Sequence, residues 1–424
     1  MHRIAIDLTP LLPGGDNGGA KLLVLELLFQ FGKAIHDFDF LLLTADWNHQ
    51  ELGDLTGSKF ERLLVIQSTP PPVPPKKLPV SFKGSCFRHL GLVKSFSPVI
   101  PLAKRIRRRW ARMPHNSSKP DEPRQTLLLQ HGVSLLFCPF TAPTYSTNRI
   151  PTVSIVYDLQ HRYYPQFFSA EELSTREATL DLVRRYSETI ICISEFTRRT
   201  LLSHCNIDPM KTCTVPVCIH ARLKKAEPLN FDLNQFHLEN ESYLFYPANF
   251  WPHKNHKMLL TAYNIFCRRN PDLKLDLVFT GALAQAESEL KSAVQKMGLN
   301  QKVHFLGYLS DENLAIVLRG CKFVIFPSLF EGFGIPLLEA FSFDKPVLCS
   351  RVGSLPEIGE QAVNYFDPRK PMSIVESIEQ LLMHPGQISE LVERGRKQLS
   401  KFNSQDMAHA YLDIFDRTLS RTPN

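Results

Sequence analysis

The sequence predicts an α/β protein made of two doubly wound units, each a parallel sheet covered by helices, with helices at the C-terminal end. Its 424 residues exceed what one compact core usually organises. Short apolar runs alternate with amphipathic runs on both sides of a polar stretch at residues 221–241. Such alternation is typical of parallel sheets with crossover helices, so we place a linker in the polar stretch.

The first unit begins with a predicted strand at residues 3–8, a glycine-rich loop at 14–19 and a helix at 21–32. The same alternation then gives predicted strands at 38–43, 133–139, 152–157, 189–193 and 211–217, and predicted helices at 171–186 and 195–204. Ser194 precedes the second of these helices and is expected to cap it. We assign residues 1–222 to an N-terminal domain.

The second unit repeats the pattern after the linker. Its predicted strands are 243–247, 275–280, 302–306, 322–327 and 346–349, and its predicted helices are 257–269, 284–297 and one that begins near Pro336. We assign residues 223–405 to a C-terminal domain and 406–424 to a C-terminal helix. Ligands of doubly wound sheets bind at the carboxyl ends of the strands, so two facing units predict a site in the cleft between them.

Residues 68–124 interrupt the α/β pattern and are interpreted as an insertion. A proline-rich run occupies 68–75, and the run Lys104–Arg112 contains six Lys or Arg together with Trp110. One interpretation of the basic run is a solvated or disordered charged face. The other is peripheral contact with anionic lipid, worth ~1 kcal/mol per basic residue near the surface, with Trp110 at the interface. No nucleic acid partner is expected, because no aromatic stacking platform or groove-reading motif accompanies the run.

Composition and cysteine spacing narrow the class of protein. With 43% apolar and 21% charged residues the chain is globular, and its net charge of +7 is too small to indicate nucleic acid by itself. None of the nine cysteines forms a C-x-x-C pair, so reduced thiols in a cytosol are expected. The sequence shows no signal peptide and no apolar run near the ~20 residues of a membrane span. We therefore expect a cytoplasmic protein that meets the inner face of the cytoplasmic membrane only at its surface.

Residues 322–340 carry the pattern on which the functional prediction depends. A buried strand ends at Pro327, and a loop with two glycines follows, so that backbone can approach a ligand closely. Pro336 suits the first turn of a helix, whose free N–H groups and dipole would face an anion. Glu331 precedes this turn and Glu339 lies one turn inside the helix, so both would project toward the same strand end.

Two carboxylates beside such a helix start indicate recognition of hydroxyl groups, because carboxylates accept hydrogen bonds from the vicinal diols of a ribose or a hexose. The alternative is that Glu331 is a surface loop residue and Glu339 a solvated helix position. Glu339 stands between Leu338 and Ala340 in an otherwise apolar helix, which makes a solvated face less natural.

The Glu331-x7-Glu339 segment resembles that of the retaining glycosyltransferases of family 4, the group 1 glycosyl transferases, which have the GT-B fold. Four further elements are similar to that family in the expected order, each at a predicted strand end: residues 6–19, 156–161, 246–256 and 350–357. The resemblance covers both domains, apart from residues 68–124 and the extreme C-terminus. It implies two Rossmann-like domains that face each other across a cleft.

The resemblance also implies a reaction and its participants. A hexose, with mannose favoured, would move from a GDP- or UDP-hexose to a glycan or lipid-linked saccharide acceptor in surface polysaccharide or glycoconjugate synthesis. Glu339 is then expected to bind the ribose hydroxyls, Glu331 the transferred sugar, and Lys254 the diphosphate. Donor contacts are also expected from the loop and helix start at Gly332, Phe333, Gly334 and Ile335. No cofactor other than the nucleotide-sugar substrate is expected.

One departure from the family pattern concerns charge. Many members carry an arginine five residues before the lysine, where this chain has Asn249. Compensation of the diphosphate would then fall to Lys254, the helix dipole, the first glycine loop and His253, or Asn249 would contact a phosphate or sugar as a neutral donor. The residues of the glycine loop expected to present backbone N–H groups are Gly15, Gly18 and Gly19.

A second departure lies in the first unit, where the family often has histidine and this chain has Tyr157. Asp158 is retained, and His161 would supply an imidazole to the cleft. The alternative is that Asp158 caps the turn that follows, as Asp commonly does, and that His161 is a surface residue.

Two further alternatives follow from the sequence. Asp37-Phe-Asp39 looks like the D-x-D of metal-dependent glycosyltransferases of another fold, but it falls between a helix end and a strand, so we interpret it as a solvated turn and predict no catalytic metal. Other GT-B chemistries, in an epimerase or a phosphorylase, and a non-catalytic nucleotide-sugar-binding subunit are the rival functions.

Overall fold

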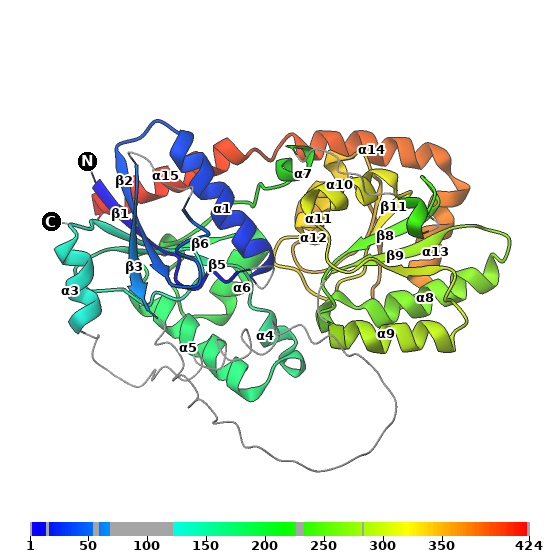
Figure 1. Ribbon diagram of the computed structural model, residues 1–424, viewed down its shortest axis with the longest axis horizontal. Coiled ribbons are helices and arrows are strands. Elements are labelled where there is room, and N and C mark those ends of the chain that lie inside the picture. Colours follow the sequence, from blue (N-terminus) through cyan, green and yellow to red (C-terminus); the bar gives the residue numbers. More distant parts are fainter. Residues whose placement is uncertain are drawn as a thin grey trace, which may run out of the picture.

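The computed structural model describes residues 2–13, 17–53, 59–67, 122–225, 233–236, 238–281 and 284–421. Within these residues the strands form two parallel sheets, one with the order β3-β2-β1-β4-β5-β6-β7 and one with the order β10-β9-β8-β11-β12-β13. Figure 1 shows each sheet in its own domain, with helices on both sides. The predicted architecture of two doubly wound units is confirmed.

The first sheet consists of β1 (His2–Asp7), β2 (Phe38–Ala45), β3 (Phe60–Ile66), β4 (Leu135–Cys138), β5 (Thr152–Val156), β6 (Thr189–Cys192) and β7 (Thr212–Thr214). Its helices are α1 (Gly18–Lys33), α3 (Glu122–Gln130), α4 (Gln160–Tyr163), α5 (Ala170–Tyr186) and α6 (Glu195–His204). The inner strands are continuous apolar runs because helices cover both faces of a parallel sheet. Strand order reverses between β1 and β4, and loops after these strands lie at the usual ligand-binding edge.

The second sheet consists of β8 (Tyr243–Pro247), β9 (Asp276–Thr280), β10 (Val303–Phe305), β11 (Phe323–Phe326), β12 (Val347–Ser350) and β13 (Val363–Phe366). Its helices are α8 (His256–Arg269), α9 (Ala284–Lys296), α10 (Asp311–Gly320), α11 (Ile335–Ser342), α12 (Leu355–Gly359), α13 (Pro371–Met383) and α14 (Pro385–Leu399). The short helix α7 (Ala221–Lys225) joins the two domains, inside the stretch predicted to be a linker. Here the strand order reverses between β8 and β11, whose following loops carry Lys254 and Glu331.

Two strands that the sequence analysis omits, β3 and β13, are both sheet edges. Every residue of β3 is at least partly exposed, and Glu61 and Arg62 break its apolar run. In β13 the two central residues are likewise only partly buried. An edge strand has one free side, so its sequence lacks the continuous apolar pattern that identifies inner strands.

Most of the predicted insertion, including Lys104–Arg112, lies outside the described residues, and so does Gly15. Only α3, at its end, belongs to the described chain. No helix of the described part is both long enough and apolar enough to cross a membrane.

The C-terminal helix α15 (Ser404–Arg421) leaves the second domain and packs against the first sheet, beside α1. In Figure 1 it is the red helix that lies in the same half of the molecule as β1 and β2. Thr418 and Thr189 at the start of β6 share a hydrogen bond of 2.8 Å between their hydroxyl oxygens. Phe415 lies 5.1 Å from the ring of Phe137 between ring centres. The predicted C-terminal helix is therefore part of the core of the N-terminal domain.

Replacement of Phe415 by Ala is expected to lower the stability by about 3–5 kcal/mol, since it removes a buried ring that contacts Phe31, Phe38 and Phe137. The fall would be measured as a lower midpoint of thermal unfolding. His409→Ala, on the exposed face of the same helix, is the control and should leave the midpoint unchanged. Equal effects of the two substitutions would contradict the packing of α15 on the first sheet.

Candidate active site

Lys254 and Glu331 meet at the carboxyl ends of two neighbouring strands, β8 and β11. The ammonium Nζ of Lys254 lies 2.7 Å from Oε1 of Glu331, with side-chain exposures of 17% and 10%. The ammonium also lies 5.2 Å from the ring centre of Phe326. Because both charged groups are largely shielded from water, their attraction is screened less than that of a surface pair. The structure thus brings together two of the predicted site residues.

The turn that carries Lys254 is fixed by hydrogen bonds to neighbouring loops. The hydroxyl of Tyr246 donates to the carbonyl of Lys254 at 2.8 Å. Asn255 adopts a left-handed conformation with φ of 62°, and its side-chain amide donates to the carbonyls of Pro327 and Pro368 at 3.1 and 2.9 Å. Asn tolerates this conformation better than most residues. The Lys254 turn and the loop before Glu331 are therefore held as one unit.

Glu339 is buried on α11, where its Oε1 accepts a hydrogen bond of 2.6 Å from Nη2 of Arg222. Arg222 lies on α7 and also pairs, through Nη1, with Asp311 of α10. Burial raises the pKa of Glu339, while the charge and the hydrogen bond of Arg222 act against that rise. Arg222 therefore favours the ionised form of a carboxyl group that would otherwise retain its proton more readily.

The loop between Glu331 and α11 has the shape that its glycines and proline predict. Gly334 is the N-cap of α11 with φ of 103°, a conformation that non-glycine residues rarely adopt, and a proline occupies the first turn. The ring of Phe333 is buried and lies 6.1 Å from that of Phe402 between ring centres. Ile335 reaches the N-terminal domain, because a Cβ added to Gly19 would lie 2.7 Å from its Cδ1.

The first glycine loop is therefore adjacent to the start of α11, as the sequence analysis expects. Gly18 adopts a positive φ of 51° at the first position of α1, and a Cβ there would meet no atom within 4 Å. The N-terminus of a helix carries N–H groups without intrahelical partners and a favourable dipole for anions. Two helix starts, of α1 and α11, thus lie at the same point between the domains.

The two domains are in direct contact at Gly332. A Cβ at this position would lie 2.3 Å from the carbonyl oxygen of Tyr157 and 3.2 Å from Cβ of Asp158. The carbonyl of Gly332 accepts hydrogen bonds from the hydroxyl of Ser194 at 2.7 Å and from that of Thr197 at 3.3 Å. Ser194 is also the N-cap of α6, which confirms the predicted cap. The carbonyl of Gly332 is therefore engaged in the contact between the domains, and the expected donor contact of the Gly332 backbone stays a prediction.

Asp158 occupies the contact between the domains but also caps its own turn. Its Oδ1 accepts the N–H of Gln160 at 2.8 Å, which is the structural role that the sequence analysis gives as the alternative. The side chain lies beside Gly332 and close enough to His253 to affect its pKa. Asp158 thus belongs to the same cluster as the Lys254 turn.

The predicted position of His161 in the cleft is corrected by the structure. Its ring is 3% exposed, and Nε2 lies 3.0 Å from Oε1 of Glu177 on α5. The ring also packs edge-to-face on Phe168. Burial lowers the pKa of His161, so the neutral imidazole is favoured. The residue fills the packing between α4 and α5, because the turn after Asp158 directs it into the N-terminal domain.

The sequence analysis expects His253 to supply positive charge to the diphosphate, and the structure corrects this prediction. Burial and the neighbouring Lys254 lower its pKa to about 3, with a smaller opposing effect of Asp158. The imidazole is therefore neutral at physiological pH. Its backbone carbonyl accepts the N–H of Leu329 at 2.7 Å, which adds a further link between the Lys254 turn and the Glu331 loop.

Asn249 lies after β8, with its side chain partly buried. A Cβ at Gly281, after β9, would lie 2.8 Å from the Cα of Asn249, so the backbone of the neighbouring loop passes directly against it. The position is at the carboxyl edge of the sheet, as predicted.

Two contributors escape the sequence analysis. Arg222 lies in a polar stretch with no local pattern, and its partners Asp311 and Glu339 are distant in sequence. Asn255 stands directly before α8 and adopts the left-handed conformation. Asn visits this conformation more readily than most residues, so an Asn just before a predicted helix is the signal that could have indicated a sharp turn there.

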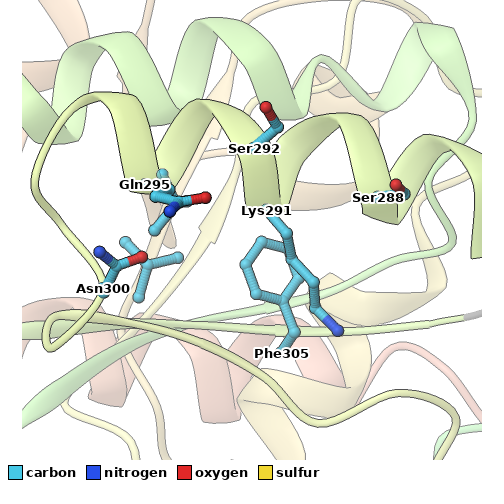
Figure 2. A pocket seen from close by; sticks show the side chains of 8 residues that line it. Ser288, Lys291, Ser292, Gln295, Asn300 and Phe305 are labelled. Carbon is cyan, nitrogen blue, oxygen red and sulfur yellow. The ribbon is translucent and has the colours of Figure 1, made fainter.

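A surface hollow of about 470 Å³ lies elsewhere, between α9 and the edge strand β10. Figure 2 shows Ser288, Lys291, Ser292 and Gln295 along α9, with Asn300 and Phe305 below them. None of the residues that line it belongs to the predicted site. Among the residues described, no three His, Cys, Asp or Glu side chains are grouped so that they could hold a metal ion.

Residues 231–398 match the family described as Glycosyl transferases group 1. The chain is similar to O-antigen chain mannosyltransferase B of Escherichia coli, with 25% identity over 253 residues, 59% of this chain and 66% of that protein. It is also similar to the serotype-specific mannosyltransferase WbdA of Escherichia coli, with 31% identity over 170 residues, 40% of this chain and 21% of WbdA. The matched segments thus span less than two thirds of these relatives.

Solved structures share the fold across both domains. HepE of Anabaena, in a complex with UDP and glucose, superposes with a TM-score of 0.68 at 15% identity, over 98% of this chain and 100% of that chain. WaaG, a glycosyltransferase involved in lipopolysaccharide biosynthesis, superposes with a TM-score of 0.63 at 15% identity, over 97% of this chain and 99% of that chain. The chain therefore has the GT-B fold, and the segment that matches Glycosyl transferases group 1, residues 231–398, lies in its C-terminal domain.

Replacement of Arg222 by Met is expected to destabilise the protein by roughly 3 kcal/mol at neutral pH, because it leaves the carboxylate of Glu339 buried without a partner. In this variant the pKa of Glu339 rises further above its unfolded value of about 4.3, so the destabilisation applies above the folded pKa and disappears as the pH falls toward the unfolded value. Thermal unfolding at acid and neutral pH measures the difference. Adding Glu339→Gln should restore most of the loss at neutral pH, and a loss independent of pH would contradict this account.

Proposed function

We propose that this chain is a glycosyltransferase that moves a hexose from a nucleoside-diphosphate sugar to a saccharide acceptor. The observation that carries the proposal is the Lys254–Glu331 pair beside the start of α11, with Glu339 on the same helix, inside the segment that matches Glycosyl transferases group 1. A cation, a helix start and two buried carboxylates in one place suit a ligand that has a diphosphate and several hydroxyl groups.

The nucleotide would bind to the C-terminal domain. Ribose hydroxyls would donate to Glu339, whose ionised form is favoured by Arg222. The diphosphate would face Lys254 and the N-terminus of α11, and the transferred sugar would lie near Glu331. Since Lys254 is paired with Glu331 in the structure, donor binding would exchange that carboxylate for phosphate oxygens and leave Glu331 available to sugar hydroxyls.

The reaction itself follows from the charges. The bond between the anomeric carbon and the diphosphate oxygen breaks, and the acceptor hydroxyl oxygen forms the new bond on the same face, so that the anomeric configuration is retained. The leaving diphosphate accepts the proton of the acceptor hydroxyl. Negative charge develops on the leaving group. A cation already fixed in place, such as Lys254, stabilises that charge without the reorganisation that water molecules would need. This compensation is proposed to require no metal ion and no further cofactor.

The substrate class is inferred from the relatives. Two of them are mannosyltransferases of Escherichia coli, one described for the O-antigen chain, and this favours mannose as the sugar and a growing surface polysaccharide as the acceptor. GDP- and UDP-hexoses are both compatible with a ribose site at Glu339. The acceptor would enter from the N-terminal domain, and a lipid-linked acceptor would be reached at the inner face of the cytoplasmic membrane, where Lys104–Arg112 would contact anionic lipid.

Lys254→Met is expected to lower the rate of sugar transfer by about 10²–10³-fold, because the developing charge on the diphosphate loses its nearest cation. Release of nucleoside diphosphate from a panel of GDP- and UDP-hexoses with oligosaccharide acceptors measures the rate. Lys257→Met is the control, since Lys257 lies on the exposed side of α8 with a side-chain exposure of 75%. Donor binding without turnover in the unaltered protein would instead favour a non-catalytic binding subunit.

Glu339→Gln is expected to weaken the binding of a nucleoside diphosphate by roughly tenfold or more, the usual range for loss of a hydrogen bond to a charged group. The stabilisation of the protein by the ligand in thermal unfolding reports the affinity. A 2′,3′-dideoxy nucleoside diphosphate is the matched probe, because it lacks the hydroxyls that Glu339 would bind. Equal weakening for both ligands would mean that Glu339 does not contact the ribose.

A further inference from the structure

The first turn of α6, in the N-terminal domain, is capped from the C-terminal domain by Glu357. Its Oε1 accepts the backbone N–H of Glu195 at 2.8 Å, and its Oε2 accepts that of Phe196 at 2.9 Å. The first N–H groups of a helix have no intrahelical partner, and a carboxylate near them is favoured by the helix dipole. Glu357 therefore forms two charge-assisted hydrogen bonds across the boundary between the domains.

The other donors of this turn are satisfied within α6. The hydroxyl of Ser194 accepts the N–H of Thr197 at 3.1 Å, and the carbonyl of Ser194 accepts the N–H of Arg198 at 3.0 Å. These bonds leave the N–H groups of residues 195 and 196 for an external acceptor. One domain thus presents two donors where the other presents the two oxygens of a single carboxylate.

Glu357 is connected to Glu331 through a single serine. The N–H of Glu357 donates to the carbonyl of Ser354 at 2.9 Å. The hydroxyl of Ser354 donates to the carbonyls of Glu331 and Phe333 at 3.1 and 2.8 Å, and its N–H donates to Glu331 at 3.2 Å. A Cβ at Gly353 would lie 2.5 Å from the carbonyl oxygen of Glu331, so the two segments are packed without a gap.

Helix α6 also contacts the loop after Glu331 directly. The hydroxyl of Ser194, which caps α6, donates to the carbonyl of Gly332 at 2.7 Å. The start of α6 therefore binds both the Glu331 loop and the segment that supports it from behind. If the domains separate, the bonds from Ser194 and from Glu357 are lost together.

We propose that Glu357 is a positioning residue of the transfer reaction. It binds the N-terminus of α6 when the domains come together and, through Ser354, fixes the backbone of Glu331 opposite Lys254. Its two hydrogen bonds to α6 exist only in the arrangement in which the domains touch, so it favours the closed enzyme without contacting the donor. The turnover part of this inference rests on the proposed function, whereas the effect on domain closure does not.

Glu357→Ala is expected to lower kcat by about tenfold, as for loss of a favourable charge at a helix N-terminus. The affinity for nucleoside diphosphate should fall by no more than the same factor, because the proposed direct contacts of the nucleotide, in the C-terminal domain and at Arg222, stay intact and only the share of binding that is coupled to closure is lost. Glu357→Gln retains one acceptor oxygen, so its kcat should lie between that of the unaltered protein and that of Glu357→Ala. Glu360→Ala is the control: this nearby carboxylate pairs with Lys401 of its own domain.

A substitution on the other side of the boundary tests the partner of Glu357. Glu195→Ala and Glu195→Pro both remove the side chain, but only the proline also removes the N–H that Glu357 accepts. Proline is tolerated at this first helical position, and Ser194 already has the extended conformation that suits a residue before proline. Glu195→Pro should lower kcat relative to Glu195→Ala, and this difference should vanish when Glu357 is Ala. A difference that persists unchanged would overturn the proposed pairing.

Domain closure can be followed independently of turnover. With one fluorophore on each domain, energy transfer measures the distance between them, and saturating nucleoside diphosphate should close the unaltered protein more fully than Glu357→Ala. Unchanged kcat and unchanged energy transfer in Glu357→Ala would overturn the inference. If the unaltered protein transfers no sugar from any nucleotide-sugar donor, the proposed function fails. The change in fluorescence energy transfer between the domains still decides the role of Glu357 in closure.

Discussion

Two backbones from different domains approach each other at Gly332 so closely that no side chain fits between them. A Cβ at this position would lie 2.3 Å from the carbonyl of Tyr157. This approach lets Ser194 bond to the carbonyl of Gly332 and lets Glu357 reach the start of α6. The loop that carries Glu331 is therefore shaped by both domains, although it belongs to one of them. Separation of the domains would release it.

The charges of the site follow from the same arrangement. Glu331 and Glu339 are both largely removed from water, and each is paired with a cation, Lys254 and Arg222 respectively. An isolated buried carboxylate would favour its protonated form, which accepts fewer hydrogen bonds. At Glu339 the charge and the hydrogen bond of Arg222 oppose this effect of burial on the pKa, which keeps the carboxylate ready to accept hydrogen bonds from hydroxyl groups. Lys254 comes from the adjacent strand end, whereas Arg222 comes from the segment between the domains, so the site draws on three parts of the chain.

The predicted site was brought together only in part. Lys254, Glu331 and Glu339 lie as their positions at the ends of neighbouring strands imply, because the carboxyl ends of parallel strands lie at one edge. His161 and His253 do not serve as predicted. The first packs against α5, and the second is only partly exposed and lies beside Lys254, which together lower its pKa to about 3. The type of a residue and its place in a motif do not reveal how deeply the side chain is buried, and burial decides the charge of an imidazole.

The sequence by itself determined the two α/β units, most of their inner strands and helices, the cap at Ser194 and the helix start at Pro336. These features depend on apolar runs, periodicity and turn residues within a few positions of one another. Only the tertiary structure decided that α15 returns to the first sheet, that Arg222 pairs with Glu339 and that Glu357 caps α6 across the domain boundary. Each of these contacts joins residues more than a hundred positions apart, and no local pattern encodes which distant group will be its partner.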